Sequence, residues 1–447
     1  MFILRDLLIP LQQEFSTTAQ GKKRSVWFVY TLLAVVIPFT SSITSNLLRA
    51  LETLFGFKIE QQRFYTFMAS TTLPWKHLWQ TMWRLIPDPL TDGRLLVALD
   101  DSINPKTGGK IFGCGHFHDH AAKDNQKHYP WSQCIVAIGL LKKVKSRWAS
   151  LPLDFRFYLM EKVIKAEKIN AKRRGETVAF ETKMDQAATI LKAVYDHFKQ
   201  PVIAVTDSWF GNDGLWSRLE RGREGVFHLL SRLRTNITLY ALAPVIAEGT
   251  KGKPGRPRKY GMRHGSVDQC AAIFREQAQT LSVFLYGKQR QVQAFTQIVM
   301  LKTLKCPIRV VWVYRRSQYV ALFTTDLTLS VEQIIEYYGA RWKIESGFKE
   351  IKQEIGSAKS QTRNADAVIN HLNFCMMAAT LTWIYADRLQ CEPDRRYKIR
   401  GRSSFAFSDV RRIIAEAALD PGFQSICPRP VQTAQNSFVK TLLRMVA

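Results

Sequence analysis

Five consecutive segments in the first half of this chain constrain its fold more than any other feature. Apolar runs at Leu95–Leu99, Gln133–Leu141 and Leu151–Leu159 have the length and composition of buried strands. A long helical pattern at about 176–198 and a further apolar run, Pro201–Val205, follow them. The order of three strands, a helix and a fourth strand predicts an α/β fold in which helices pack on a mixed sheet.

Two of these predicted strands end in acidic residues. Asp100 and Asp101 follow the first strand, and Asp207 follows the fourth. Hard Mg²⁺ takes carboxylate oxygens and keeps positions for water and phosphate, so these ends suit a metal site. Side chains alternate along a strand, so Asp100 and Asp101 are expected to face opposite ways and only one of them to be a ligand. The alternative for Asp207 is a capping role in a strand-to-helix turn.

A second group of chemically useful residues lies near the C-terminal third. The Ser330–Gln333 capping box predicts a helix that carries Tyr338, Arg341, Glu345 and Lys352. At 100° per residue these four lie at roughly 0°, 300°, 340° and 320°, within an arc of about 60°. Such a stripe can hold a divalent metal between two phosphate-binding cations. The alternative is a charged helix face that is only solvated.

The composition favours a polyanionic partner. The chain has 64 Lys and Arg against 37 Asp and Glu, a formal net charge of +27 spread along the 447 residues. Neutralising phosphates releases counterions, which gives sequence-independent affinity for DNA. A hydrophobic content of 46% and eleven Trp are enough to bury several cores, so a large globular body is expected.

Cysteine usage and hydropathy indicate where the protein works. The seven cysteines show no C-x-x-C spacing, which is typical of reduced thiols in a cytosolic protein. The apolar run Val26–Phe39 is too short to span a bilayer, so it is interpreted as a buried helix, with no membrane partner.

The helical stripe also carries a resemblance to a known family. Its spacing, Y-x2-R-x3-E-x6-K, and the core Arg341-Trp342-x-Ile-Glu345 are similar to those of DDE-type bacterial insertion-sequence transposases. That group has an RNase H-like catalytic core interrupted by a β-rich insertion. The strand order above is the RNase H-like order. The resemblance therefore implies this α/β fold, with helical N- and C-terminal regions.

The resemblance implies particular roles for the acids. Asp101, Asp207 and Glu345 would be the catalytic residues and the ligands of two Mg²⁺ ions, with Mn²⁺ able to substitute. In the resembled family an acidic residue precedes the catalytic Asp, which favours Asp101 as the first ligand; Asp100 is the alternative.

The same resemblance assigns DNA contacts. Tyr338, Arg341 and Lys352 would contact phosphates of the cleaved and flanking nucleotides. Trp342 would stack on a flipped base near the element end, or else be a core aromatic.

Five regions are expected: a helical DNA-binding domain at 1–90, the core at 91–222 and 326–392, a β-rich insertion at 223–325, and a basic helical C-terminal region at 393–447.

Two further segments have DNA-binding patterns. The segment 45–68 has a helix-turn-helix rhythm in which Gln61, Gln62, Arg63 and Tyr65 could reach base edges, or it is an ordinary helical hairpin. The cationic loop 251–259 carries Arg256 and Arg258 in a Gly-Arg-Pro-Arg core that resembles an AT-hook; minor-groove binding, general backbone contact and a basic linker are the alternatives.

A cluster of soft ligands precedes the second predicted strand. Cys114, His116, His118 and His120 occur at every second residue. This spacing lacks the second ligand pair of a zinc module, so phosphate contact or simple loop chemistry is favoured over structural zinc.

Taken with the resemblance, these patterns predict a DNA transposase. It would cut insertion-sequence ends and join them to target DNA, by cut and paste through a hairpin. The alternatives are a two-metal DNA nuclease without strand transfer and a non-catalytic DNA-binding descendant. The expected partner is double-stranded DNA (ends and target), the expected assembly on DNA a homodimer, and the expected location the bacterial cytoplasm, associated with the nucleoid.

Overall fold

The protein is described here by a computed structural model, which covers residues 2–120, 122–244, 258–397, 404–420 and 422–423. Two compact units divide the chain: a first unit of Met1–Pro89, Asp101–Lys183 and Glu345–Ala447, and a second unit of Leu90–Asp100 and Met184–Ile344. The chain contains both helices and strands, and the strands form a large mixed sheet, which confirms the predicted α/β class.

The elements have the following bounds. The α-helices are α1 Phe2–Gln13, α2 Ala19–Val36, α3 Thr44–Phe55, α4 Gln61–Met68, α5 Trp75–Arg84, α6 Glu161–Lys165, α7 Lys183–Phe198, α8 Asp213–Arg218, α9 Val267–Phe274, α10 Val331–Ala340, α11 Trp342–Lys349, α12 Ala365–Arg388 and α13 Phe407–Ala418. The strands are β1 Leu95–Pro105, β2 Cys114–His116, β3 Trp131–Val144, β4 Arg147–Tyr158, β5 Lys172–Arg173, β6 Glu176–Thr177, β7 Val202–Thr206, β8 Phe227–Arg232, β9 Thr238–Tyr240, β10 Arg263–Ser266, β11 Gln279–Leu285, β12 Lys288–Leu301, β13 Cys306–Arg315 and β14 Gln318–Thr324.

The second unit is built on one side of β1. Residues Leu95–Leu99 of β1 pair in parallel with β7, and β7 pairs in parallel with β8. The sheet continues through antiparallel β14, β13 and β12, with β11 and β9 paired to β12 and β10 to β9. Every residue of β7 is buried, as expected of a parallel strand covered on both faces. Helix α10 packs on β7, β8, β11 and β14.

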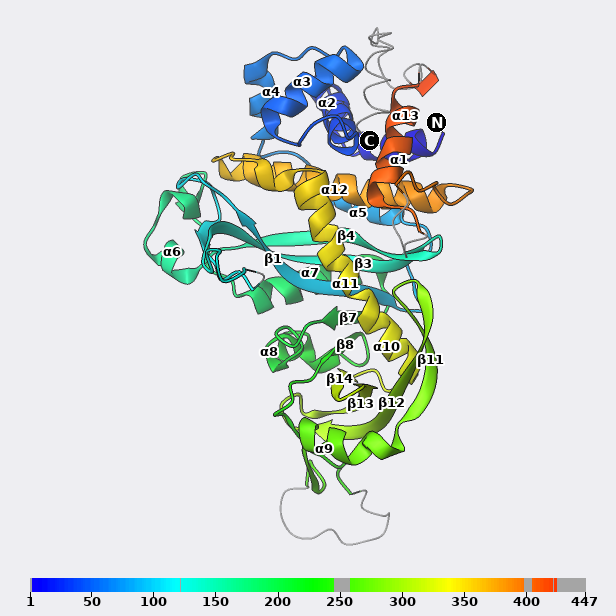
Figure 1. The fold of residues 1–447 in the computed structure, drawn as a ribbon. Coiled ribbons are helices and arrows are strands. Elements are labelled where there is room, and N and C mark those ends of the chain that lie inside the picture. Colours follow the sequence, from blue (N-terminus) through cyan, green and yellow to red (C-terminus); the bar gives the residue numbers. More distant parts are fainter. Residues whose placement is uncertain (1, 121, 245–257, 398–403, 421, 424–447) are drawn as a thin grey trace. The chain divides into compact units, whose positions relative to one another are not determined.

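The first unit holds the antiparallel hairpin of β3 and β4, with β2 paired to β3. Helix α12 packs on β4, and on its other sides it contacts α1, α2, α4, α5 and α13 (Figure 1). Aromatic side chains fill the space between these helices: the Phe374 ring of α12 lies 5.2 Å from Phe28 and 5.1 Å from Trp75. Helix α12 is therefore the centre of a helical layer to which both the N-terminal helices and α13 contribute.

Among the described residues, α12 is the one helix long and apolar enough to cross a membrane. However, 94% of its most apolar window is buried inside the protein. The N-terminal apolar run is likewise buried: Phe28–Val36 of α2 are in the core, as predicted. All six cysteines that the structure describes are free thiols.

Several element boundaries differ from those predicted. Strand β1 does not end at Leu99 but continues through both acids to Pro105, and the helix predicted from about 176 begins at Lys183. Within residues 223–325, where a β-rich insertion is expected, β8 pairs in parallel with β7, whereas β9 pairs with β12. Helix α9 was not predicted, although its Ser266–Gln269 capping box is visible in the sequence.

Candidate active site

Asp100 lies in β1, directly after the segment that pairs with β7. Its Oδ2 accepts a hydrogen bond from Nη1 of Arg341 at 3.1 Å, and the two side chains are only 18% and 8% exposed. The Arg341 guanidinium also lies over the rings of Tyr338 (5.8 Å) and Trp342 (5.3 Å). A largely buried arginine needs such a charged partner, so Asp100 holds Arg341 in place.

Asp101, the next residue, belongs to the first unit and has a different cation. Its Oδ2 accepts from Nζ of Lys183 at 2.8 Å and lies 3.6 Å from Sγ of Cys134 on β3. Burial raises the pKa of Cys134 to about 12, so the thiol stays protonated at neutral pH and acts as a weak donor. The two adjacent acids thus have separate partners, as expected from alternation along a strand.

Asp207 lies just beyond β7, in a turn that the backbone fixes. Its Oδ1 accepts from the backbone N–H groups of Trp209 and Phe210, each at 3.0 Å. These are turn hydrogen bonds; the cap of α8 is Asn212, whose side chain accepts from the Gly214 N–H. Asp207 therefore does not cap α8. The hydrogen bonds of the turn orient its carboxylate instead.

Two residues that sequence reasoning missed support this turn. Ser231 Oγ on β8 donates to the Asp207 carbonyl at 2.7 Å. A Cβ on Gly211 would come within 2.1 Å of that hydroxyl, so only glycine fits there.

Tyr338 belongs to the same neighbourhood in the second unit. Burial raises its pKa above the usual value, Arg341 and Arg232 act to lower it, and Asp207 acts to raise it. The phenol is therefore near two arginines and one of the predicted ligands. Arg232, at the end of β8, is a cation that the sequence did not single out.

The helix that carries Tyr338, Arg341, Glu345 and Lys352 begins as predicted, but its conformation changes near Lys352. The Ser330–Gln333 capping box is present, and Arg341 between α10 and α11 keeps helical angles (φ −48°, ψ −39°). After α11 the chain forms a π-helical turn at Glu350–Glu354, closed by the Ile355 N–H donating to the Glu350 carbonyl at 2.9 Å. The constant 100° step used for Lys352 therefore does not hold in this turn, because a π-helical turn has an i→i+5 bond.

Lys352 lies beside β1 in the first unit. Its Nζ donates to Ser102 Oγ at 2.6 Å and to the Ile103 carbonyl at 2.7 Å. Burial lowers the pKa of Lys352 to about 8, whereas Asp119, Cys134 and Asp101 act to raise it. The lysine is consequently held next to Asp101 by two neutral acceptors.

The predicted residues form two groups, one in each unit. Asp100, Asp207, Tyr338 and Arg341 are close in the second unit, and Asp101, Lys183 and Lys352 are close in the first. Glu345 belongs to the first unit, so the convergence of the three catalytic acids remains a prediction. Among the described residues, no group of three or more His, Cys, Asp or Glu side chains could hold a metal.

Comparison with known families decides the class of this protein. Residues 11–295, more than half of the chain, match the family described as DDE superfamily endonuclease. The chain belongs to the DDE superfamily endonucleases. Residues 291–378 also match the family described as archaeal putative transposase ISC1217. Among curated proteins, none is similar enough in sequence to count as a match.

Membership has direct consequences for this endonuclease. It supports a transposase or nuclease role, with DNA as the partner, and DDE enzymes generally use divalent metal ions. Asp101, Asp207 and Glu345 offer the oxygen donors that Mg²⁺ takes. By its chemistry this set of donors suits a divalent metal, and one of the three, Asp101, already pairs with a cation, the Lys183 ammonium at 2.8 Å.

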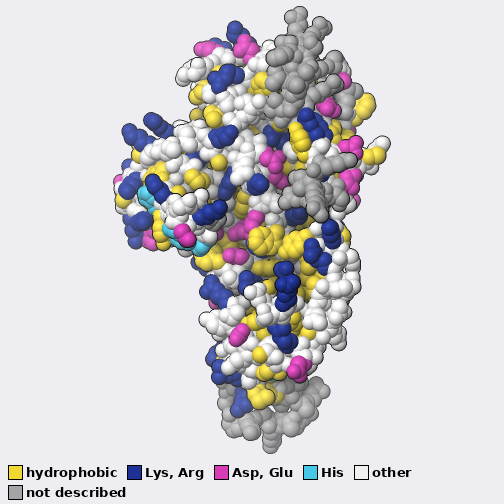
Figure 2. Space-filling model, in the orientation of Figure 1, with side chains coloured by type: hydrophobic (Ala, Val, Ile, Leu, Met, Phe, Trp, Pro, Cys, Tyr) yellow, Lys and Arg dark blue, Asp and Glu magenta, His cyan; other side chains and the backbone are white. Residues whose placement is uncertain are grey.

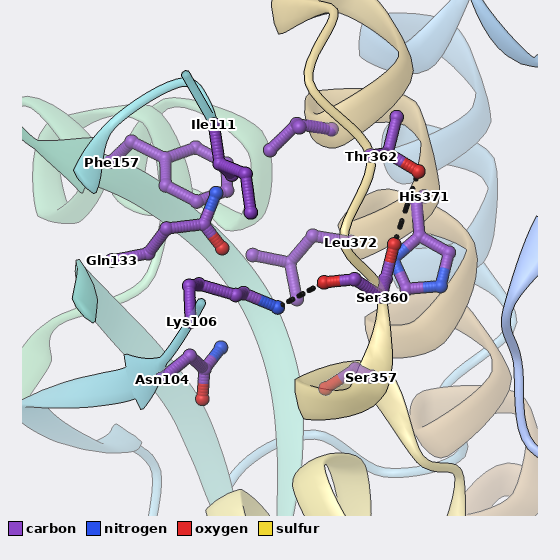
Figure 3. A pocket seen from close by; sticks show the side chains of 11 residues that line it. Asn104, Lys106, Ile111, Gln133, Phe157, Ser357, Ser360, Thr362, His371 and Leu372 are labelled. Carbon is purple, nitrogen blue, oxygen red and sulfur yellow. Dashed lines mark hydrogen bonds between the residues drawn. The ribbon is translucent and has the colours of Figure 1, made fainter. Parts of the chain in front are cut away.

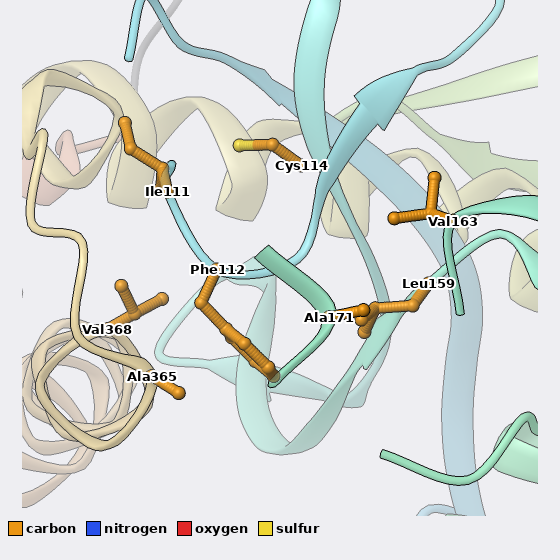
Figure 4. Close-up of a cluster of buried hydrophobic side chains, with 8 residues drawn as sticks. All are labelled: Ile111, Phe112, Cys114, Leu159, Val163, Ala171, Ala365 and Val368. Atoms are coloured by element: carbon orange, nitrogen blue, oxygen red, sulfur yellow. The ribbon is translucent and has the colours of Figure 1, made fainter. Parts of the chain in front are cut away.

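The Cys114–His120 cluster of the endonuclease is divided between core and surface. Cys114 is buried in a hydrophobic cluster with Phe112, Leu159 and Val368 (Figure 4), and burial raises its pKa to about 12. His116 points out, with Nδ1 3.1 Å from the Tyr129 carbonyl. The thiol is thus buried in the core, whereas the imidazole of His116 is exposed, so these two soft ligands do not face a common site.

The histidines of this loop form one group on the surface (Figure 2). The His118 ring lies 4.5 Å from His120 and 6.4 Å from His128. Phosphate contact by this loop remains a prediction.

The other predicted DNA contacts are partly described. Trp342 is 49% exposed, and Gln61, Gln62, Arg63 and Tyr65 of α4 are exposed, as a DNA-reading helix requires. Arg256 lies outside the described residues, while Arg258 is exposed.

Helices α2 and α4 enclose a groove of about 500 Å³. Three cations line it (Lys23, Arg24 and Arg63), together with Trp27, and no acidic residue is among the lining side chains. Arg24 is held by Thr72 Oγ1 at 2.7 Å and by Ser70 Oγ. Lys and Arg side chains are otherwise spread over the visible face rather than gathered on one element (Figure 2).

Proposed function

We propose that this DDE endonuclease is an insertion-sequence transposase that cuts the element ends and joins them to target DNA. The main observation in support is that each of the adjacent acids on β1 pairs with its own cation: Asp100 with Arg341 and Asp101 with Lys183. These separate pairings support Asp101 as the metal ligand and Asp100 as the residue that positions a phosphate-binding arginine.

Asp101, Asp207 and Glu345 would hold two divalent ions, which would supply the Lewis-acid chemistry of phosphoryl transfer. The protein's own groups bind and orient the DNA. Arg341, fixed by Asp100, presents its guanidinium to a phosphate, because a planar fork suits bidentate contacts. Lys352 adds a second positive charge beside β1.

The steps at each end follow from the same groups. A water oxygen attacks the phosphodiester and frees a 3′-OH, which attacks the opposite strand, so that a hairpin forms on the element end and the flanking strand leaves. A second water molecule opens the hairpin, and the regenerated 3′-OH attacks a phosphodiester of the target DNA and releases a 3′-OH there. Hairpin formation requires a base to leave the stack, and the half-exposed Trp342 ring offers a surface for it.

The groove between α2 and α4 supports end recognition by the N-terminal helices. Its cations suit phosphates, and the exposed polar face of α4 lies next to it. As proposed here, two copies of the chain bind the two ends of one element.

The test is a labelled end substrate incubated with Mg²⁺ and a target plasmid. A transposase gives nicked ends, hairpins and end–plasmid joints, all lost in Glu345→Gln. Cleavage without joints identifies a nuclease. Binding without cleavage, in a protein that folds and binds metal, identifies a non-catalytic descendant.

A further inference from the structure

The position of the Lys183 ammonium is electrostatically unfavourable in two respects. It is the first residue of α7, where the helix macrodipole carries partial positive charge and opposes a cation. Its ammonium is only 19% exposed, which adds a desolvation cost. Something specific must therefore hold it at this position.

Two contacts of the Lys183 ammonium offset these costs. Nζ of Lys183 donates to Asp101 Oδ2 at 2.8 Å, and it lies 5.2 Å from the centre of the Tyr158 ring, within the range of a cation–π contact. Asp101 is itself 28% exposed, so the pair is shielded from water on most sides. A charge-assisted hydrogen bond of this kind is stronger than a surface ion pair.

This contact bears on metal binding, because an ammonium paired with the Asp101 carboxylate neutralises the negative charge that would attract a divalent ion. We propose that Lys183 is a tethered cation that competes with a divalent ion for Asp101. The inference rests on the proposed function, in which Asp101 is a metal ligand. Lys183 is thus a positioning residue that weakens metal affinity in the absence of DNA.

The experiment measures Mn²⁺ binding to the full-length protein without DNA, by electron paramagnetic resonance of free Mn²⁺. Lys183→Met removes the charge and keeps the length, and we expect it to tighten binding about tenfold, the lower end for loss of a charge-assisted hydrogen bond. Lys183→Arg keeps a cation and should bind as the wild type does. The gain should vanish in the double variant Lys183→Met with Asp101→Asn.

Lys192→Met is the matched control. Lys192 is on the same helix and pairs with Glu220 at 2.9 Å, so the same charge is lost away from Asp101. It should leave Mn²⁺ affinity unchanged. Lys183→Gln gives a second neutral variant if the methionine impairs folding, which circular dichroism checks.

The outcomes separate the inference from the proposed function. If Asp101→Asn weakens Mn²⁺ binding but neither neutral Lys183 variant tightens it, the competition is wrong and the ligand assignment stands. If Asp101→Asn binds as tightly as the wild type, Asp101 is no ligand and both fail.

Discussion

His371 should make the stability of this protein fall in mild acid. The imidazole is fully buried on α12, and its Nε2 lies 2.7 Å from the Ser42 carbonyl oxygen. Burial lowers the pKa of His371 to about 4 from its usual 6.5; the Ser42 contact acts to raise it, and Lys106 acts to lower it. Lys106 lines the same small cavity, of about 10 Å³, and donates to the Ser360 carbonyl (Figure 3).

The sign follows from proton linkage. Below pH 6.5 the unfolded chain protonates this imidazole and the folded chain does not, so the unfolded state binds more protons and the free energy of unfolding decreases as pH falls. The full effect of a shift from 6.5 to about 4 is about 3 kcal/mol at 1.36 kcal/mol per pH unit. About 2 kcal/mol of this is lost between pH 7.5 and pH 5.

The assay compares thermal unfolding of the wild type and His371→Gln at pH 7.5 and pH 5. Glutamine offers an N–H where Nε2 was and does not titrate. The drop in Tm between the two pH values should be smaller in the variant by roughly 4 °C, the shift expected for about 2 kcal/mol in a unit of this size. Equal drops in the two proteins would refute the buried neutral imidazole, because other titrating groups are common to both.

Asp101→Asn should reduce cleavage of an end substrate at least ~1000-fold by removing one ligand charge, whereas Asp100→Asn, which only loosens Arg341, should cost about tenfold; equal losses measured on denaturing gels would contradict the separate roles. The kcat/KM of cleavage should fall as pH rises through about 8, since Lys352 then loses its proton, and in Lys352→Arg this alkaline limb should move upward. An unmoved limb would assign the titration to another group. Replacing Lys23 and Arg24 together by Gln should lower the slope of log affinity for duplex DNA against log salt by about 2. An unchanged slope in a filter-binding titration would place the DNA elsewhere.

The central strands could be predicted because each is a continuous apolar run. Leu95–Leu99 and Val202–Val205 are buried as expected, since a parallel strand covered on both faces has no polar positions. The hydropathy pattern did not predict where β1 ends. Asp100–Asn104 are polar or half-exposed, so their strand conformation depends on tertiary pairing and not on their own hydropathy.

The candidate site shows the same limit. Arg341 and Lys352 were predicted from their spacing on one helical stripe together with the resemblance to a known family, both of which are visible in a sequence. The partners Lys183 and Cys134 are 82 and 33 residues from Asp101, as their numbers show, and only the folded chain brings them to it. No local pattern marks a lysine at a helix start as the counterion of a distant acid.

The π-helical turn at Glu350–Glu354 has a consequence for the history of this family. An i→i+5 turn contains one residue more than an α-helical turn, and this one is held by the buried Glu350, which accepts from Trp383 Nε1 at 3.1 Å. A relative that lost one residue between the positions of Glu345 and Lys352 would keep the glutamate and the lysine, but one position closer together in its sequence. A sequence search that requires a fixed number of residues between the glutamate and the lysine would miss such relatives. Their common ancestry with this chain would have to be recognised from the geometry of the helix instead.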